Sequence, residues 1–255
     1  MIDIQNQADH RNIEIDKVGV KDVKYPIIVS DRKNKIQHTI ATINMYVNLP
    51  HHFKGTHMSR FIEILNEYRG RINLKTLFTI IDEMKEKLDA RSAHLEIEFP
   101  YFIEKKAPVT GEKSLMEYSC KFCASHNKER DLYVEVNVPI TTLCPCSKEI
   151  SEFGAHNQRG NVSVKLRFEK FLWIEDIVKC VEESASSEVF SLLKRPDEKF
   201  LTEKAYSNPM FVEDVVRSVA SKLVVDPNIT WFSVGAENYE SIHKHNAYAF
   251  VEKNG

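Results

Sequence analysis

Two spacings of apolar residues run through the first half of the chain and predict its elements. Alternation of apolar and polar positions predicts strands at 25–30, 36–47, 93–99 and 116–122. Apolar residues three and four apart predict one helix from about Ser59 and a second after Asn73, with Thr56 or Ser59 capping the first and Asn73 the second. The first half therefore reads as two strands, two helices and two strands.

The second half repeats this order of elements without repeating the sequence. Alternation predicts strands at 132–140, 162–169, 229–237 and 247–251. Helical spacing predicts helices within 174–193 and after Pro209. The duplicated order predicts an α+β fold of two modules, each an antiparallel sheet backed by helices. A charged run at 127–131 marks the join, so we expect an N-terminal arm at 1–20 and modules at 21–130 and 131–255.

Composition limits the class of protein. The chain has 255 residues, of which 42% are hydrophobic and 28% charged, as in ordinary soluble proteins. Its net charge of −2 supplies no overall positive field for nucleic acid. We expect no membrane association, because no apolar run is long enough to span a bilayer and residues 1–5 show no signal pattern. Five cysteines, an odd number, favour a reducing compartment and a cytoplasmic enzyme.

The loop between the strands at 132–140 and 162–169 carries the strongest candidate chemistry. Cys144 and Cys146 are two apart and would face the same side of an extended chain, and His156 follows them in the same loop. Thiolate and imidazole are ligands that zinc and other divalent metals accept, and a catalytic metal needs only three protein ligands. The alternative is that the thiols are small buried apolar groups and His156 is a hydrogen-bonded loop residue.

Two acidic positions elsewhere each have two interpretations. Pro196 is expected to end a helix and leave Asp197 and Glu198 in a turn. Glu198 is then either solvated or the third ligand of a metal site with Cys144 and His156. Glu213 opens a helix, where an acidic side chain favours the helix dipole. Its carboxylate could instead accept two parallel hydrogen bonds from a guanine edge.

Two further pairs complete the candidates. His243 and His245 would share one face of an extended segment, and imidazoles suit proton transfer near neutral pH, although loop histidines are commonly surface residues. Cys120 and Cys123 form a C-x-x-C pair that could join the later cysteines in a structural zinc site. Against this, Cys120 belongs to an alternating strand pattern.

Taken together, these stretches resemble the GTP cyclohydrolase type IB family over nearly the whole chain after about residue 10. The matching motifs are TTLCPCSKEIS at 141–151, GAHNQRG at 154–160, GTHMSRF at 55–61, KRPDE at 194–198, NPMFVED at 208–214 and ESIHKHN at 240–246. The block from the cysteines to the Arg-Gly pair is highly specific.

The resemblance implies a fold, an assembly and a reaction. The fold is the tunnelling fold, with tandem modules that assemble, typically as a homotetramer, around a shared β-barrel with active sites between subunits. The reaction is the first step of tetrahydrofolate synthesis, in which GTP and water give 7,8-dihydroneopterin 3'-triphosphate and formate. One divalent transition metal, zinc, manganese or iron, is implied at each active site.

The resemblance also implies roles for individual residues. The metal ligands would be Cys144, His156 and Glu198, leaving a position for the water that attacks the guanine ring. Proton transfer would fall to His243, with His245 and Glu240 in support, while Cys146 would assist catalysis or protect the site. Glu213 would hold the purine. The candidates for triphosphate binding are Lys148, Arg159, Arg60 and His57.

Two other functions compete with this interpretation. A nitrile reductase of the queuosine pathway, on the same fold, would use a cysteine nucleophile and NADPH without a catalytic metal. A non-enzymatic binding module would be held together by a structural zinc that includes Cys120 and Cys123. Activity in strong chelator would favour the first, and unfolding on replacement of either cysteine would favour the second.

Overall fold

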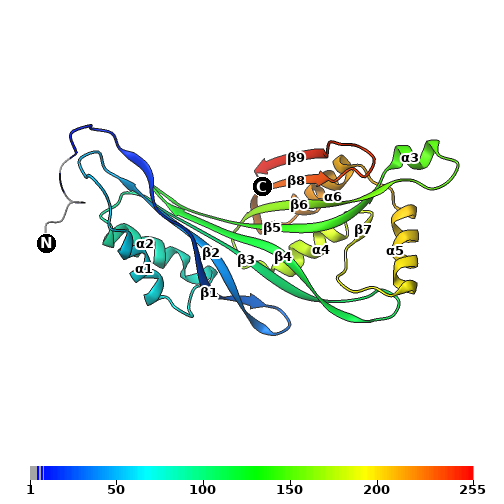
Figure 1. Ribbon diagram of the computed structural model, residues 1–255, viewed down its shortest axis with the longest axis horizontal. Helices are drawn as coiled ribbons and strands as arrows, with labels where there is room; N and C mark the ends of the chain where they lie inside the picture. Colours follow the sequence, from blue (N-terminus) through cyan, green and yellow to red (C-terminus); the bar gives the residue numbers. More distant parts are fainter. Residues whose placement is uncertain (1–4, 6, 8, 255) are drawn as a thin grey trace. The chain divides into compact units, whose positions relative to one another are not determined.

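The computed structural model describes residues 5, 7 and 9–254, which form an α+β fold of antiparallel strands and helices (Figure 1). The strands are β1 (Ile15–Asp31), β2 (Lys35–Leu49), β3 (Ala93–Lys106), β4 (Lys113–His126), β5 (Arg130–Leu143), β6 (Asn157–Phe168), β7 (Ser187–Glu188), β8 (Ile229–Asn238) and β9 (Ala247–Asn254). The helices are α1 (Met58–Glu67), the 3-10 turn η1 (Leu74–Thr76), α2 (Leu77–Lys87), α3 (Pro145–Ile150), α4 (Ile174–Glu182), α5 (Arg195–Ser207) and α6 (Val212–Leu223).

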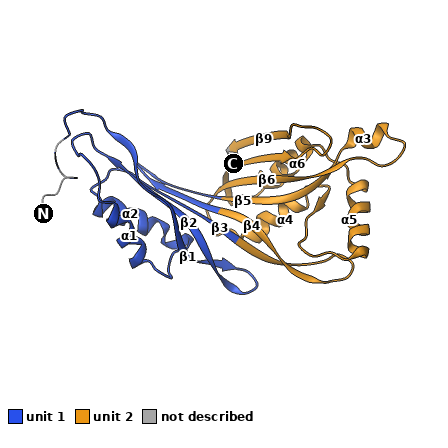
Figure 2. Cartoon of the chain, in the orientation of Figure 1, with its two compact units in different colours: residues 1–100, 121–134 blue, residues 101–120, 135–255 orange. Residues whose placement is uncertain are grey.

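The chain divides into two compact units, which Figure 2 distinguishes by colour. Unit 1 comprises residues 1–100 and 121–134, and unit 2 comprises residues 101–120 and 135–255. The hydrogen-bonded strand order is β1-β2-β3-β4-β5-β6-β8-β9, with β7 beside β5.

Unit 1 is built on β1, β2 and the first part of β3, which pair antiparallel. Alternate residues of β2, including Ile43, Met45 and Val47, are buried, which is the period-two pattern of a strand with one apolar face. The helices α1 and α2 contact each other and bury apolar residues at helical spacing: Phe61, Ile64, Leu65, Leu77, Ile80, Ile81 and Met84. The core of this unit is therefore the one its apolar pattern predicts.

Unit 2 is built on β6, β8 and β9, which also pair antiparallel, with Val164 opposite Val234 and Val234 opposite Val251. Helix α6 packs on β8 and β9 and contacts α4. Its buried residues Val212, Val215, Val216, Val219 and Leu223 form one apolar stripe. The loop with the predicted site residues begins where β5 ends in this unit.

Every predicted strand is present, and most extend further than their apolar runs. β1 starts at Ile15, inside the expected arm of residues 1–20. Residues 1–4, 6 and 8 of that arm lie outside the described part of the chain. The modules 21–130 and 131–255 stay a prediction.

Three local predictions are wrong. The helical runs expected around 174–193 stop short, because α4 ends at Glu182, where a serine-rich segment begins and Ser184 donates its hydroxyl to the Cys180 carbonyl at 2.7 Å. Helix α1 is preceded by His57 rather than by a capping Thr56 or Ser59. Pro196 does not stop a helix but lies in the first turn of α5, where its missing N–H leaves no helix hydrogen bond unmade.

Candidate functional site

Cys144 begins the loop and fixes how it turns. It occupies the N-cap of α3 with an extended backbone, Pro145 follows at the first helical position, and the Cys144 sulfur accepts from the Ser147 amide at 3.4 Å. The Cys144 amide donates to the His156 carbonyl at 3.1 Å. The backbones of Cys144 and His156, separate in sequence, are therefore held next to each other.

Cys146 does not face the same way as Cys144 on an extended segment, as its spacing suggested. It lies inside α3 and is exposed, because the chain turns into a helix directly after Cys144. Cys144 is half-buried. Only one of the two thiols is therefore built into the framework that holds His156.

His156 is linked to two residues that the sequence analysis did not single out. Its Nδ1 lies 2.9 Å from Gln158 Oε1, and Gln158 Nε2 donates to Thr142 Oγ1 at 2.9 Å. Gln158 and Thr142 are both buried. Both lie outside the predicted strands 132–140 and 162–169, so the apolar pattern did not mark either residue as buried.

Glu240 reaches the same imidazole from the end of β8. Its Oε2 lies 3.9 Å from His156 Nδ1, and both side chains are largely buried, at 14% and 12% exposure. The Tyr239 amide donates to the Arg159 carbonyl at 2.9 Å, which continues the pairing of β6 with β8 beyond Asn238. The strand pairing, rather than the loop sequence, therefore delivers Glu240 to His156.

Glu198, the predicted third metal ligand, is exposed in the first turn of α5. Within the described part of the chain, no group of three His, Cys, Asp or Glu side chains is close enough to hold a metal. Cys144 and His156 nevertheless fit such an ion chemically, because thiolate and imidazole suit a borderline-soft divalent metal. The Nδ1 contact with Gln158 also resembles the outer hydrogen bond that metal-binding histidines make.

Asp197, the neighbour of Glu198, is fully buried. Its carboxylate accepts hydrogen bonds from the amides of Val109, Thr110 and Lys194, each at 2.9 Å, and from the Thr110 hydroxyl at 2.7 Å. Burial alone would raise the pKa of Asp197, but these hydrogen bonds outweigh burial and hold it well below its usual range. The first turn of α5 is thus fixed to the turn after β3.

Glu213 is exposed in the first turn of α6, and its neighbour Asp214 makes the cap. The Phe211 amide donates to Asp214 Oδ2 at 3.0 Å. Asp214 thus accepts the amide of the residue that precedes the helix, while Glu213 is exposed in the first turn. Both the helix-dipole and the purine-binding interpretations of Glu213 stay predictions.

His243 and His245 lie in the exposed segment between β8 and β9. Their rings stack, with centroids 5.1 Å apart and planes 19° apart. The two side chains therefore share one side of the segment, as their spacing predicts.

The predicted phosphate-binding residues differ in their surroundings. Lys148 Nζ donates to the Tyr206 carbonyl at 2.6 Å and lies 4.4 Å from the centre of the Tyr206 ring. Arg159 is exposed. In unit 1, Arg60 donates to the Lys87 carbonyl at 2.7 Å, and His57 precedes α1. Lys148 and Arg60 are thus already engaged by carbonyl oxygens.

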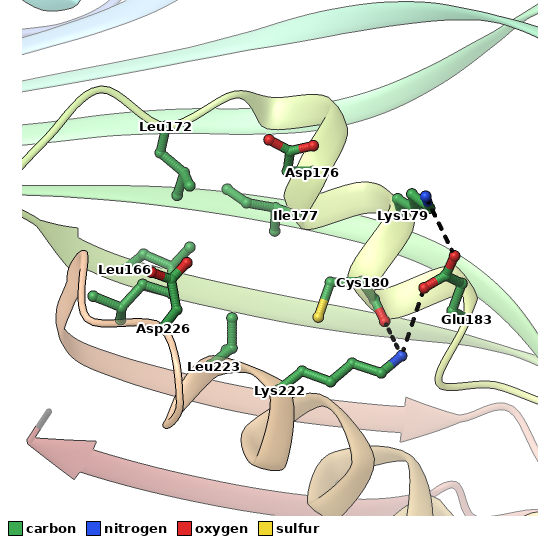
Figure 3. A pocket seen from close by; sticks show the side chains of 11 residues that line it. Leu166, Leu172, Asp176, Ile177, Lys179, Cys180, Glu183, Lys222, Leu223 and Asp226 are labelled. Carbon is green, nitrogen blue, oxygen red and sulfur yellow. Dashed lines mark hydrogen bonds and ion pairs between the residues drawn. The ribbon is translucent and has the colours of Figure 1, made fainter.

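A recess in unit 2 lies away from these residues, between α4 and α6 (Figure 3). Its volume is about 240 Å³, and Lys222 crosses it to the Cys180 carbonyl at 3.3 Å and to Glu183 at 3.9 Å. Ligand pockets generally measure roughly 300–1,000 Å³. The recess includes none of the predicted site residues and is smaller than a nucleotide site requires.

The alternative cysteine pair is buried in β4. Burial raises the pKa of the Cys120 thiol well above its usual range, which disfavours the thiolate that a metal would need. Of the residues described, neither Cys120 nor Cys123 belongs to a group of three metal-binding side chains. Both match small apolar core residues.

Comparisons with known proteins show relatives in sequence and, separately, a likeness in fold. The family model described as type I GTP cyclohydrolase folE2 matches residues 1–249. The GTP cyclohydrolase FolE2 of Syntrophus aciditrophicus is 64% identical, over 99% of this chain and 100% of the relative, and that of Geobacter metallireducens is 62% identical, over 99% and 97%. A urate oxidase mutant from Bacillus sp. TB-90 resembles the fold with a TM-score of 0.56 at 10% identity, covering 94% of this chain and 98% of that one.

Proposed function

The chain belongs to the type I GTP cyclohydrolase FolE2 family and has GTP cyclohydrolase I activity, and from this premise we propose how its residues divide the work. The reaction converts GTP and water into 7,8-dihydroneopterin 3'-triphosphate and formate, at the start of folate synthesis. The observation that carries the proposal is the backbone link between Cys144 and His156, which joins the two donors best suited to a divalent metal.

Cys144, His156 and Glu198 would hold one divalent transition metal, zinc, manganese or iron. When bound, such an ion supplies a Lewis acid that lowers the pKa of water toward neutrality. Cys144 contributes from a helix N-cap, and His156 from a ring whose Nδ1 is already occupied by Gln158. Glu198 contributes from the first turn of α5, which Asp197 fixes in place.

The remaining residues would bind the purine and move protons. Glu213, at the rigid start of α6, would accept two hydrogen bonds from the guanine edge. His243, stacked on His245, would transfer protons at the opening ring and at the released formate. Glu240 would support proton transfer beside His156, and Cys146 would assist from the exposed face of α3.

The triphosphate and the assembly complete the proposal. Lys148, Arg159, Arg60 and His57 would supply contacts to phosphate oxygens. The chain would form a homotetramer of tandem tunnelling-fold modules around a shared β-barrel, with active sites between subunits. Strand β9 stands at the end of the strand series, and an edge strand in this position supports such association.

The proposed location is the cytoplasm. The five cysteines, all in the described part of the chain, are thiols rather than disulfides, as in a reducing compartment. Within the described residues, no helix has the length and apolar character needed to span a membrane. The family assignment favours GTP cyclohydrolase activity over the two competing functions, the nitrile reductase and the structural-zinc module.

GTP turnover with defined metals tests the ligand assignment. Formate release and the fluorescence of oxidised pterin are followed in chelator and after adding manganese, zinc or iron. Glu198→Ala should abolish metal-dependent turnover and lower the bound metal. Glu203→Ala, at an exposed position of the same helix, is the control and should leave turnover and bound metal unchanged. Full activity of Glu198→Ala, or turnover in strong chelator, would contradict the proposal.

A further inference from the structure

The His156 ring is bonded through one nitrogen to an amide that is itself anchored. Nδ1 lies 2.9 Å from Gln158 Oε1, and the other end of that amide donates from Nε2 to Thr142 Oγ1, also at 2.9 Å. The three side chains form a line from the end of β5, through the start of β6, to the loop. Because each side chain is hydrogen-bonded to the next, the positions of Thr142 and Gln158 constrain the orientation of the His156 ring.

The chemistry of the amide decides where the imidazole proton lies. A glutamine amide has one accepting oxygen and one donating nitrogen, so donation to Thr142 turns the oxygen toward His156. An oxygen at 2.9 Å from Nδ1 requires a proton on Nδ1. Glu240 Oε2, 3.9 Å from the same nitrogen, favours the same proton electrostatically. The Nε2 lone pair is then left to accept.

Burial and backbone contacts make this arrangement rigid. Gln158 is 6% exposed and Thr142 is fully buried, so moving the amide out from between Thr142 and His156 would leave buried polar groups unsatisfied. The His156 backbone is held at both ends, because its amide donates to Ser147 Oγ at 3.3 Å and its carbonyl accepts from Cys144. The His156 side chain can therefore move only by rotation about its side-chain torsions, and the hydrogen bond to Gln158 limits that rotation.

We propose that Gln158 is a positioning residue that holds His156 with its proton on Nδ1 and its Nε2 available as a ligand, and that Thr142 anchors it. The inference rests on the proposed function only in taking Nε2 as the atom that binds metal. Gln158 acts through His156 and does not itself contact GTP. Metal-binding histidines generally depend on a partner of this kind for orientation and basicity.

The experiment compares three variants of the full-length chain. Gln158→Leu removes the acceptor at similar size, whereas Gln158→Glu keeps an oxygen toward Nδ1. Gln37→Leu is the matched control, because Gln37 also bonds a side chain, that of Asp31, but lies in unit 1. The protonated ring nitrogen is read by solid-state 15N NMR of metal-free, [15N]histidine-labelled protein. The His156 signal is the one, among ten histidines, that disappears in His156→Asn.

We expect the parent and Gln158→Glu to show the proton on Nδ1, and Gln158→Leu to move a large fraction to Nε2. The affinity for zinc, measured by titration against a chelating dye, should fall about 10- to 100-fold in Gln158→Leu and be restored in Gln158→Glu. Gln37→Leu should change neither. A parent His156 protonated on Nε2 would overturn the inference without any variant, so it stays testable even where Gln158→Leu does not fold.

Different results would overturn the positioning role of Gln158 and the metal-ligand role of His156. A folded Gln158→Leu with an unchanged His156 tautomer overturns the positioning role while leaving the metal ligands in place. Unchanged zinc affinity in His156→Asn would instead overturn the ligand assignment of the proposed function. The tautomer is read in metal-free protein, so activity of the loaded enzyme does not enter either result.

Discussion

Asp197 accepts two hydrogen bonds from Thr110, one from the backbone amide at 2.9 Å and one from the hydroxyl at 2.7 Å. The residues are far apart in sequence, and the contact joins the first turn of α5 to the turn between β3 and β4 within unit 2. Because Glu198 is the next residue, whatever fixes Asp197 also fixes the backbone of the proposed metal ligand.

Replacing Asp197 by Ala should therefore reduce both stability and metal binding. The variant removes the buried carboxylate that accepts from the amides of Val109, Thr110 and Lys194, so we expect the melting temperature to fall by about 5 °C or more. Metal content after dialysis against limiting zinc should also fall. Glu203→Ala serves as the control on the same helix. Normal metal content in a folded Asp197→Ala would show that Glu198 does not depend on this anchor.

Asp31 should make the stability of the β1–β2 hairpin depend on pH. Burial would raise its pKa, but hydrogen bonds from the amide and side chain of Asn34, from Gln37 and from the Lys33 amide lower it below the usual value. A carboxyl with a lowered pKa in the folded state stabilises the fold above its unfolded pKa of about 4. This contribution is lost as the pH falls through the folded value.

The measurement is amide hydrogen exchange of Asn34, whose N–H donates to Asp31 at 2.6 Å. In the parent, protection of this amide relative to Asp31→Asn should be greatest near pH 7 and shrink as the pH falls below about 4. Asp31→Asn keeps an oxygen acceptor but cannot ionise, so its own protection should vary less with pH. A difference between the two that stays constant down to pH 3 would contradict the role of the charge.

Most of the fold follows from local pattern, and its errors are instructive. The alternation that predicts β2 and the apolar stripe that predicts α6 both reflect one buried face, so the elements appear where expected. Pro196 was misread because proline both ends helices and opens them. The local signal for a helix start is Asp197, which follows the proline and accepts a hydrogen bond from the amide of Lys194, the residue before the helix.

In the candidate site, too, some residues follow from local sequence and others only from contacts made in the fold. Cys144 and His156 could be chosen because their side chains are metal ligands by type, and the structure brings them together. Gln158 and Thr142 carry no such chemistry by type. Their importance arises only when β5 and β6 pair and place one side chain against the other. Residues that position a ligand are therefore harder to predict from sequence than the ligand itself.

Cys120 and Cys123 should prove dispensable for metal binding. Both are buried in β4, so Cys120→Ser places a hydroxyl in an apolar setting and should cost about 1–3 kcal/mol of unfolding free energy. Metal per chain, measured by atomic emission on the folded protein, should match that of the parent for Cys120→Ser and Cys123→Ser. Cys144→Ser should lose metal. Loss of metal from either β4 variant would revive the structural-zinc interpretation.

Even the smallest side chain in place of Gly160 should destabilise the fold and slow turnover at the candidate site. A Cβ at this position would lie 2.7 Å from Asn238 Oδ1 and 2.8 Å from the Glu237 carbonyl, closer than atoms pack, so β6 and β8 would have to separate. We expect Gly160→Ala to cost about 1–3 kcal/mol of unfolding free energy, as overpacking does. It should also slow GTP turnover, because Glu240 follows Asn238 and approaches His156 only through this pairing.

Gly235→Ala, in β8, is the matched control for Gly160→Ala. Its added Cβ would meet the Tyr248 hydroxyl at 3.1 Å and the Phe250 ring at 3.6 Å, and these exposed side-chain ends can move. Stability is compared by urea unfolding, and turnover by formate release at saturating GTP. If Gly160→Ala loses stability but keeps full turnover while Gly235→Ala changes neither, the close approach of β6 and β8 supports the fold alone. In that case the contact of Glu240 with His156 would not contribute to catalysis.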